Sequence, residues 1–350
     1  MVFVNFSIPF RYIPLNNAKK YSIMINNRLN QTQFGGNCYM DGNTFYFEWE
    51  VSLMQWLQSW LGTVGIAIAS FFTMFGEDLI CVAIIGFLYW CWDKELGKRI
   101  GINLLFAVTL SGMIKNIFMR RRPYFDNEGI KCLKAADSKA DIYDISAQGF
   151  SFPSIHATKA VTMFTGLGVY TKNKILMVIG IVLPLLVGIS RFCLGVHYPT
   201  DVIAGWLIGM LIIFLIPFLE KKIRNRWVLY AVLVLATVPG WFFCKSADYF
   251  TGFGFLTGFI VATEFEKRFV KFETTRNVLR WILRLGIGIG LYFVFNTLLK
   301  LPFSSNFLDS GTTLALAVRA IRYFIITIVI IGVYPMMFRL GDKIFKKKSS

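Results

Sequence analysis

Long apolar stretches recur along the whole chain, and they constrain the fold more than any other feature of the sequence. About ten such runs, most near the roughly 17–25 residues that cross a bilayer, are separated by polar connections. They lie near residues 56–75, 79–93, 100–118, 156–171, 175–190, 201–219, 228–244, 250–264, 282–299 and 314–338. Only helices and closed barrels satisfy their backbone hydrogen bonds in hydrocarbon, and these runs do not alternate as barrel strands do. The sequence therefore predicts an all-α, polytopic helical membrane protein.

The charge of the chain agrees with a membrane location and argues against nucleic-acid binding. Charged residues make up 16% of the 350 residues, against about 25% in soluble domains. The formal net charge is +17, but Lys and Arg occur in short clusters between apolar runs rather than along one polar face. Such clusters suit loops at an anionic membrane surface. We therefore predict a membrane lipid as the partner, and neither nucleic acid nor a protein partner.

The basic clusters also predict an orientation in the membrane. Counted in order, every cluster follows an even-numbered apolar run. The clusters fall at residues 94–99, 172–174, 221–226, 267–280 and 343–348. Because positively charged loops tend to stay on the cytoplasmic side, these loops and both termini are predicted to be cytoplasmic. The remaining connections then face outward from a cell membrane.

Polar residues that interrupt the apolar pattern gather at the predicted outer ends of the third to sixth runs. They are Lys115, Arg120 to Arg122, Pro153 to His156, Ser190, Arg191 and His197 to Asp201. Positive charge is disfavoured on the outer side of a membrane. An anionic ligand is the simplest explanation for cations at four helix ends that meet one surface.

The chain contains two histidines, and both lie in these polar segments. His197 and Asp201 are four residues apart, and Pro199 between them is compatible with the first turn of a helix. That spacing allows Asp201 to accept a proton from one ring nitrogen of His197, which leaves the other nitrogen free for nucleophilic attack. The alternative interpretation is structural, with Asp201 as a helix cap near an exposed histidine.

The neighbouring polar residues supply what the hydrolysis of a phosphate ester requires. Fixed positive charges on Lys115, Arg122 and Arg191 can hold phosphate oxygens as charge redistributes, and the arginine fork matches two oxygens at once. Ser154 adds a hydroxyl group, beside amides at the start of the fourth run. His156 then remains as a general acid for the leaving oxygen.

Three motifs formed by these residues resemble those of the type 2 phosphatidic acid phosphatase superfamily, also called lipid phosphate phosphatases. The family motifs are Lys separated by six residues from Arg-Pro, Pro-Ser-Gly-His, and Ser-Arg separated by five residues from a His with Asp four further on. Here they read Lys115…Arg122-Pro123, Pro153-Ser-Ile-His156 and Ser190-Arg191…His197…Asp201. The resemblance, to a membrane-bound bacterial-type member, implies that His197 is the nucleophile and His156 the acid. It also implies that the reaction needs no metal ion and no cofactor.

The resemblance covers about residues 51–220, which are expected to form a six-span catalytic core. Residues 1–50 are predicted to be a polar extension, of which 1–39 form an overlong start if translation begins at Met40. Residues 221–350 are predicted to add about four spans. One motif position departs from the family, because Ile155 stands where Gly is usual. Gly lets a backbone amide approach phosphate closely, so Ile155 is expected to narrow the substrate pocket or to remove one hydrogen bond.

These features predict an enzyme that hydrolyses a lipid phosphate or diphosphate through a phosphohistidine, at the outer face of the membrane. Phosphatidate, phosphatidylglycerol phosphate and polyprenyl diphosphate are the candidate substrates. Vanadate-dependent haloperoxidases share the motifs, but those are expected to be soluble. The rival hypothesis is a lipid-binding or lipid-transporting membrane protein that has kept a phosphate pocket. Broken helices in matched halves of the chain would favour a transporter, and none is evident in the sequence.

Overall fold

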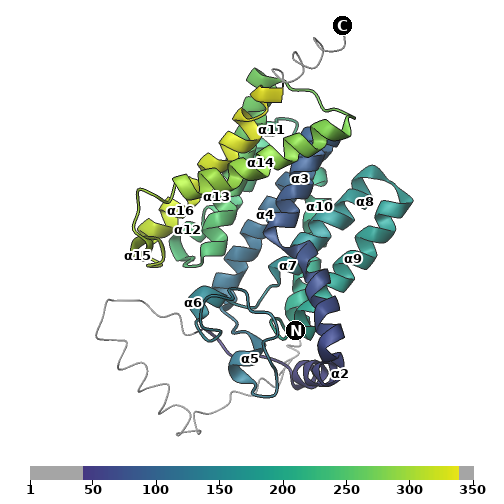
Figure 1. Cartoon of the computed structure of the whole chain (residues 1–350), viewed down its shortest axis with the longest axis vertical. Coiled ribbons are helices and arrows are strands. Elements are labelled where there is room, and N and C mark those ends of the chain that lie inside the picture. The colour runs from purple at the N-terminus through teal and green to yellow at the C-terminus, as the bar shows by residue number, and fades with distance from the viewer. Residues whose placement is uncertain (1–41, 339–350) are drawn as a thin grey trace, which may run out of the picture.

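The computed structural model describes residues 42–338, and these residues form a bundle of long helices (Figure 1). Seven of the described helices are long and apolar enough to cross a membrane. The only β-type pairing within residues 42–338 is a single bridge between Asn43 and Arg120. The predicted all-α polytopic fold is therefore confirmed. The predicted extension at residues 1–39 and the basic cluster at 343–348 lie outside the described residues.

Helices follow one another along the chain with mostly short connections. They are α2 (Glu48–Thr73), α3 (Asp78–Phe87), α4 (Lys94–Phe118), α5 (Pro123–Asp126), α6 (Ile145–Gln148), α7 (Ile155–Ala160), α8 (Gly166–Thr171), α9 (Lys174–Cys193), α10 (Pro199–Lys222), α11 (Arg226–Thr237), α12 (Gly240–Phe243), α13 (Ala247–Phe265), α14 (Val278–Leu298), α15 (Ser305–Leu308) and α16 (Thr313–Thr327). Short π-helical stretches extend α3, α13 and α16 and join α7 to α8.

The first two predicted spans cross the bundle only once, as one interrupted helix, which we call the broken passage. The start of α2 lies at one end of the bundle, where Glu50 pairs with Arg120 just beyond the end of α4. The chain after α3 lies at the other end, where α4 begins at Lys94. Because α4 has 25 residues, it separates these two ends by about 37 Å. Two antiparallel spans would have returned the chain to the side on which it began.

Local backbone geometry explains why one passage resembles two spans in the sequence. Helix α2 bends at Gly62, whose φ of 51° is unfavourable for a residue with a side chain. Trp49, Trp56 and Trp60 are exposed before this bend, as expected for residues at a membrane interface. A second break follows at Glu77, which is extended, and α3 then continues the passage (Figure 1). The polar Glu77-Asp78 pair therefore marks a break in a helix and not a loop between two spans.

This broken passage determines where the two ends of the described chain lie. Asn43 hydrogen-bonds to Met119 beyond the end of α4, whereas Phe338 packs against Trp90 at the opposite end of the bundle. The described chain thus begins and ends on opposite sides, with one passage fewer than the ten predicted. Met1 and Ser350 themselves lie outside the described residues, so the predicted cytoplasmic placement of both termini stays a prediction.

The C-terminal helices pack directly on the predicted core. Helix α13 lies between α4 and α16. Glycines allow this close approach, because a Cβ at Gly112 would lie 2.9 Å from the Cα of Tyr249, and one at Gly254 would lie 2.3 Å from the carbonyl oxygen of Ala320. One hydrophobic core contains residues from both predicted regions. The described residues before and after residue 220 therefore pack into one bundle.

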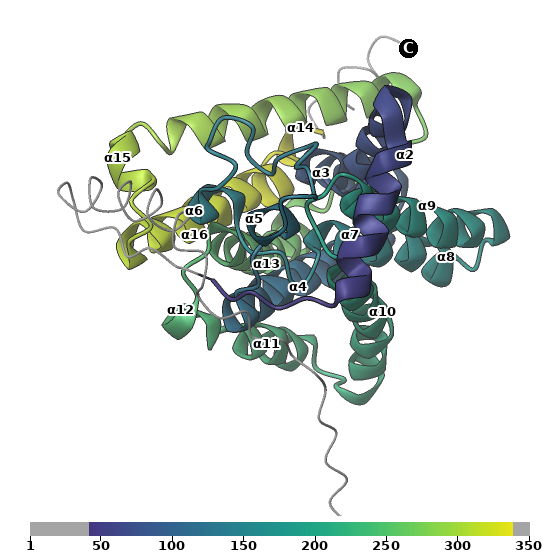
Figure 2. The ribbon, with the colours of Figure 1, turned by 90° about the horizontal axis from the view of Figure 1, so that it is seen from below.

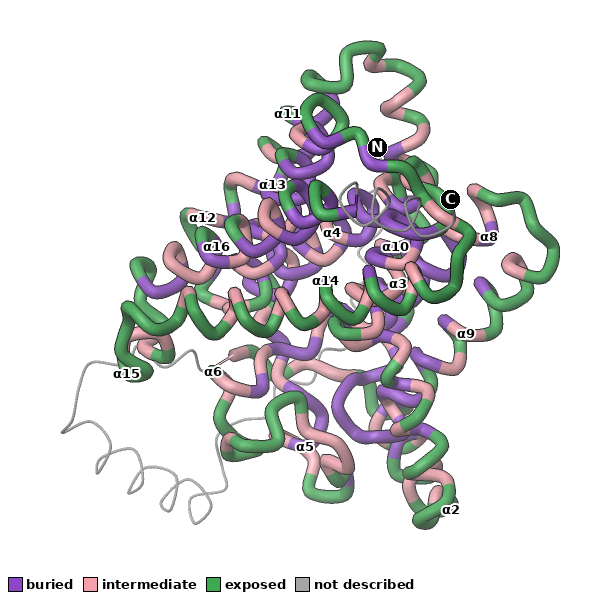
Figure 3. The backbone as a smooth tube through the Cα atoms, turned by 45° about the horizontal axis from the view of Figure 1, so that its top comes forward, coloured by how far each residue is buried: buried purple, intermediate pink, exposed green. Residues whose placement is uncertain are grey.

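Burial follows the pattern expected of a protein surrounded by lipid. Figure 3 shows buried residues along the inner faces of the long helices and exposed residues along their outer faces. Many exposed side chains are large and apolar, such as Ile175, Leu207 and Leu235. Short helices α5 and α6 and their connections cover one end of the bundle, which Figure 2 views directly. The polar motif residues lie at this covered end.

Candidate active site

Hydrogen bonds join the three sequence motifs at the covered end of the bundle. The backbone amide of Ser154, in the second motif, donates to the carbonyl oxygen of Asp201 in the third at 2.9 Å. Arg122, in the first motif, donates from Nη1 to the carbonyl oxygen of Val196 at 2.9 Å. Residues from four separate helix ends are thus held together on one side, which is the juxtaposition that the sequence predicted.

His197 and Asp201 face each other at the start of α10. The Nδ1 atom of His197 lies 3.5 Å from Oδ2 of Asp201, and both side chains are buried. That distance is longer than an ordinary hydrogen bond. The same Oδ2 accepts a hydrogen bond of 2.8 Å from the backbone amide of Tyr198, the residue that precedes the helix. Asp201 therefore does both things that the sequence left as alternatives, since it caps α10 and faces the imidazole.

A buried ion network fixes the position of Asp201. Arg120 is 1% exposed, and it donates from Nη1 to Oδ1 of Asp201 at 2.7 Å and from Nη2 to Oε2 of Glu50 at 2.8 Å. Glu50 in turn accepts hydrogen bonds from the amide and hydroxyl of Thr200. The guanidinium also lies over the ring of Tyr198, 3.9 Å from its centroid. Arg120 thus holds a carboxylate rather than an anionic ligand.

Sequence reasoning missed this network for an identifiable reason. Arg120 was grouped with the cations that an anionic ligand would explain, and Glu50 fell inside the predicted polar extension. The two residues are 70 positions apart, so their pairing has no local signal. The only available signal was an acidic residue placed just before the first apolar run.

Arg122 and Arg191, which were predicted to bind phosphate, are both buried at the site, but they have different hydrogen-bond partners. Arg122 donates from Nε and Nη2 to the carbonyl oxygen of Gln148, in addition to its bond to Val196. Arg191 donates from Nη1 to Oγ1 of Thr73 at 2.6 Å, while its Nε has no partner among the described residues. Both guanidinium groups are therefore positioned in advance, and each keeps N–H groups for a ligand.

Three buried polar atoms of the motif residues lack a hydrogen-bond partner within residues 42–338. They are Oγ of Ser154, Nε of Arg191 and Nδ1 of His197. Buried polar groups are normally satisfied, and leaving one unpaired costs about 1–3 kcal/mol. Because Nδ1 of His197 faces Asp201, the unpaired atoms of Ser154 and Arg191 are the two that indicate a place built for a polar ligand.

Lys115 and the second motif complete the site. Lys115 is buried near the end of α4, and its Nζ lies 3.4 Å from Oδ2 of Asp248 at the start of α13. Ile155 and His156 are the first two residues of α7, and the Ile155 side chain is buried. Asp248 was not anticipated, because it comes from the C-terminal region whose purpose the sequence did not reveal.

The break in the first passage supports the site from the side. Thr73 binds Arg191, and Gly76 lies so close to His156 that a Cβ there would be 2.9 Å from the Cβ of His156. Beyond the break, Asp78 forms an ion pair with Lys159, one turn after His156. The helix break thus lets α2 and α3 follow α7 closely.

Electrostatics favour a neutral imidazole at position 197. His197 lies in the connection between α9 and α10, and its burial holds the pKa of the ring well below the ordinary value of 6.5. The positive charges of Arg122, Arg191 and Lys115 lower the pKa further. An uncharged ring keeps a lone pair for attack. Within residues 42–338, no group of three or more His, Cys, Asp or Glu side chains is placed to hold a metal ion.

A pH profile tests this electrostatic arrangement. Because the folded-state pKa of His197 is depressed, the neutral ring should persist as the pH falls below 6.5, and the acidic limb of kcat/KM should lie below that pH. Arg122→Gln removes a positive charge, so the pKa of His197 should rise and the limb should move to higher pH. The wild type and Arg122→Gln are measured with the same substrate, so ionisation of the substrate contributes equally to both pH profiles. An acidic limb at the same pH in both proteins would contradict the assignment of this limb to His197.

Comparisons with known proteins agree with this geometry. Residues 98–225 match the family model of the PAP2 superfamily, and residues 250–343 match that of the PAP2 superfamily phosphatase transmembrane extension. The chain is 29% identical over 157 residues to an undecaprenyl-diphosphatase from Sulfolobus acidocaldarius, covering 43% of this chain and 68% of that protein. It is 34% identical over 90 residues to phosphatidylglycerophosphatase B from Bacillus subtilis, covering 23% and 44%.

Two further matches are of the same kind. A putative undecaprenyl-diphosphatase from Escherichia coli is 29% identical over 161 residues, covering 43% of this chain and 70% of that protein. The crystal structure of a transmembrane PAP2 type phosphatidylglycerolphosphate phosphatase from Bacillus subtilis aligns with a TM-score of 0.39 and 22% identity, over 59% of this chain and 97% of that one.

Fold, motifs and matches together define an integral membrane phosphatase whose helices span the bilayer several times. All three motifs fall within the first matched region, and α14, α16 and most of α13 fall within the second. This chain belongs to the PAP2 superfamily. The resemblance inferred from three short motifs is thereby confirmed, and the C-terminal helices are a recognised extension of the same family.

Proposed function

We propose that this protein hydrolyses the phosphate or diphosphate ester of a membrane lipid through a phosphohistidine on His197. The observation that carries the proposal is the buried pair of His197 and Asp201, together with the unpartnered buried atoms of Ser154 and Arg191 in the adjoining motif residues. Relatives named for undecaprenyl diphosphate and phosphatidylglycerophosphate support polyprenyl diphosphate and phosphatidylglycerol phosphate as substrates. Phosphatidate is the third candidate, since it presents the same phosphate group.

The residues suggest a reaction in two steps. Because Nδ1 of His197 faces Asp201, the Nε2 lone pair attacks the terminal phosphorus. The bond from that phosphorus to the ester oxygen, or in a diphosphate to the bridging oxygen, breaks as His156 gives that oxygen a proton, which releases the alcohol or the lipid monophosphate. Lys115, Arg122 and Arg191 hold the phosphoryl oxygens. Water then attacks the phosphohistidine while His156 accepts its proton. The phosphorus–nitrogen bond breaks, which releases phosphate and restores both histidines.

We place the site on the outer face of a cell membrane. The basic residues near Lys94, Lys172, Lys221 and Lys267 all lie at the other end of the bundle, and positive loops favour the cytoplasm. In this orientation the described chain begins outside, beside Arg120, and ends inside, beside Trp90. Labelling of a single cysteine introduced at Asn43 by an impermeant reagent on intact cells would support this orientation, whereas labelling only after lysis would contradict it.

One experiment separates the enzyme from the rival lipid-binding or lipid-transporting protein. Purified protein in detergent is given phosphatidate, phosphatidylglycerol phosphate or polyprenyl diphosphate, with EDTA present, and released phosphate is measured. Turnover of at least one lipid is expected, with no dependence on an added metal ion. Saturable binding of these lipids without phosphate release would favour the rival and contradict the proposal.

Asp248 is expected to weaken substrate binding by competing for Lys115. Its carboxylate is 48% exposed and lies 3.4 Å from the ammonium group. Asp248→Asn should therefore lower KM for a lipid phosphate about two- to five-fold, which corresponds to the modest energy of an exposed ion pair. Lys115→Met should raise KM.

A matched control for Asp248→Asn is Asp309→Asn, which removes one acid from the connection between α15 and α16. That change should leave KM and kcat unaltered. If Asp248→Asn instead raises KM, the carboxylate holds Lys115 in place rather than competing for it.

A further inference from the structure

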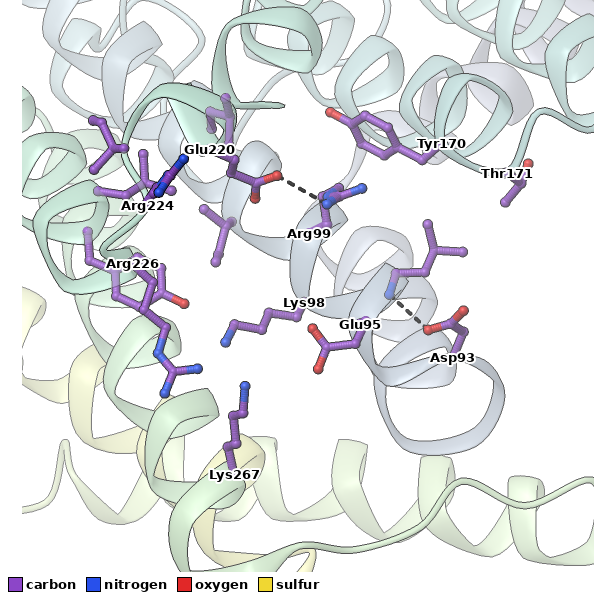
Figure 4. A pocket seen from close by; sticks show the side chains of 16 residues that line it. Asp93, Glu95, Lys98, Arg99, Tyr170, Thr171, Glu220, Arg224, Arg226 and Lys267 are labelled. Carbon is purple, nitrogen blue, oxygen red and sulfur yellow. Dashed lines mark hydrogen bonds and ion pairs between the residues drawn. The ribbon is translucent and has the colours of Figure 1, made fainter. Parts of the chain in front are cut away.

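A second cationic site lies at the end of the bundle opposite His197. A cavity of about 500 Å³ opens there between α4, α8, α10 and α11 and the π-helical end of α13 (Figure 4). Its cations are Lys98, Arg99, Arg224, Arg226 and Lys267, and its acids are Asp93, Glu95 and Glu220. The two ends of α4 are about 37 Å apart, so this cavity is distinct from the catalytic site beside Lys115.

Internal ion pairs account for only part of this positive charge. Arg99 pairs with Glu220 at 3.1 Å. Lys98 and Arg226 both pair with Glu264, at 2.6 and 3.3 Å, so two cations share one carboxylate. Arg224 and Lys267 have no ion pair within residues 42–338.

Three cationic groups converge inside the cavity. Figure 4 shows the ends of Lys98, Arg226 and Lys267 directed toward one another. Glu264 compensates only part of this charge, because Lys98 and Arg226 share its one carboxylate. The remaining like charges, including that of Lys267, repel unless a further anion lies between them. The arrangement therefore favours an anion with several oxygens, which can accept from more than one of these donors.

The walls of the cavity indicate what such an anion is attached to. Ile102, Ile216 and Leu229 contribute apolar surface to the lining, to which Tyr170 and Tyr230 also belong. Aromatic and cationic residues together are typical of a membrane interface, and basic pockets between helices on the cytoplasmic side bind anionic lipid head groups. A phosphate group at the cations with acyl chains along the helices satisfies both surfaces.

We infer that this cavity binds a phosphate-bearing anion, as the head group of an anionic phospholipid from the leaflet opposite the catalytic site. The bound anion joins two regions, because Lys98, Arg99 and Arg224 belong to the part that matches the superfamily, while Lys267 belongs to the extension. Binding should therefore stabilise the packing of the extension on the core. The inference does not depend on which lipid the catalytic site hydrolyses.

Paired charge changes provide the test. The variant Arg224→Gln with Lys267→Gln removes two cavity cations that hold no ion pair within the described chain. The control, Lys172→Gln with Lys174→Gln, removes the same charge near the same end of the bundle, from residues that do not line the cavity. Thermal unfolding is measured in nanodiscs of phosphatidylcholine with or without phosphatidylglycerol, and in detergent with sodium phosphate or sodium chloride at equal ionic strength. Both variants keep the catalytic site, so any contribution from that site is common to them.

Phosphatidylglycerol should raise the Tm of the wild type and of the control by a few degrees, as expected for a ligand that binds only the folded state. The cavity variant should lose most of this shift. A second outcome is that the cavity variant keeps the Tm shift produced by phosphatidylglycerol and loses only the Tm shift produced by inorganic phosphate in detergent. The cavity then binds an anion, but that anion is a soluble phosphate compound rather than a lipid head group. Equal shifts in the cavity variant and the control, with both ligands, would overturn the inference.

Discussion

His197→Ala is expected to reduce phosphate release from every lipid substrate by at least about 10³-fold, because the variant lacks the atom that forms the covalent intermediate. Brief reaction of the wild type with a ³²P-labelled lipid phosphate should leave label on the protein that is stable to alkali and labile to acid. The variant should carry none. A His197→Ala protein that turns over lipid at the wild-type rate, with an unaltered melting temperature, would eliminate this mechanism.

His156→Gln is the informative companion, because it tests the acid without removing the nucleophile. Its activity on an alkyl phosphate should fall strongly, since an alkoxide leaves poorly without a proton. Its activity on p-nitrophenyl phosphate should fall much less, because p-nitrophenolate needs no general acid. His197→Ala should be inactive on both substrates. Equal losses on both substrates in His156→Gln would assign that residue to binding rather than to acid catalysis.

Arg120→Leu is expected to destabilise the protein by about 3–5 kcal/mol, because it leaves Asp201 and Glu50 as buried carboxylates without their cation. The variant should also lose kcat, since Asp201 would no longer be held against His197. Unfolding in detergent by heat or denaturant measures the first effect, and phosphate release from the folded fraction measures the second.

Arg121→Leu is the matched control for Arg120→Leu. Its guanidinium is 26% exposed and lies 3.3 Å from Asp126, so the loss should be at most about 1 kcal/mol. Similar losses of stability in the two variants would show that the buried network contributes no more than a surface pair. A stable Arg120→Leu protein with normal kcat would remove Arg120 from the positioning of Asp201.

The sequence was sufficient for the parts of the site that are encoded locally. His197 and Asp201 face each other because they are four residues apart at the first turn of one helix. Lys115, Ser154 and Arg191 lie at helix ends that the apolar pattern already placed on one side. The family motifs add roles to these positions, and those roles are what the variants above test.

The long-range contacts at the site could not be predicted from the sequence. Glu50, Arg120 and Thr200 meet across separations of 70 and 150 residues, and no short pattern reports such a contact. The broken first passage was misread for a related reason, because Glu77 and Asp78 have the composition of a loop. Their charges are tolerated beside the site since Lys134 and Lys159 pair with them. Hydropathy alone cannot distinguish a helix break supported by distant cations from a turn between two spans.

The contact between Glu50 and Thr200 also constrains the biogenesis of the protein. Ribosomes add about 5–20 residues per second, so the 150 residues between the two partners take about 8–30 seconds to synthesise. During that interval the first helix is already made, but its docking partners on α10 are not. Arg120, which is 70 residues from Glu50, is available earlier as a partner, whereas the contact with Thr200 must wait for α10. The catalytic end of the bundle can close only after α10 has been inserted.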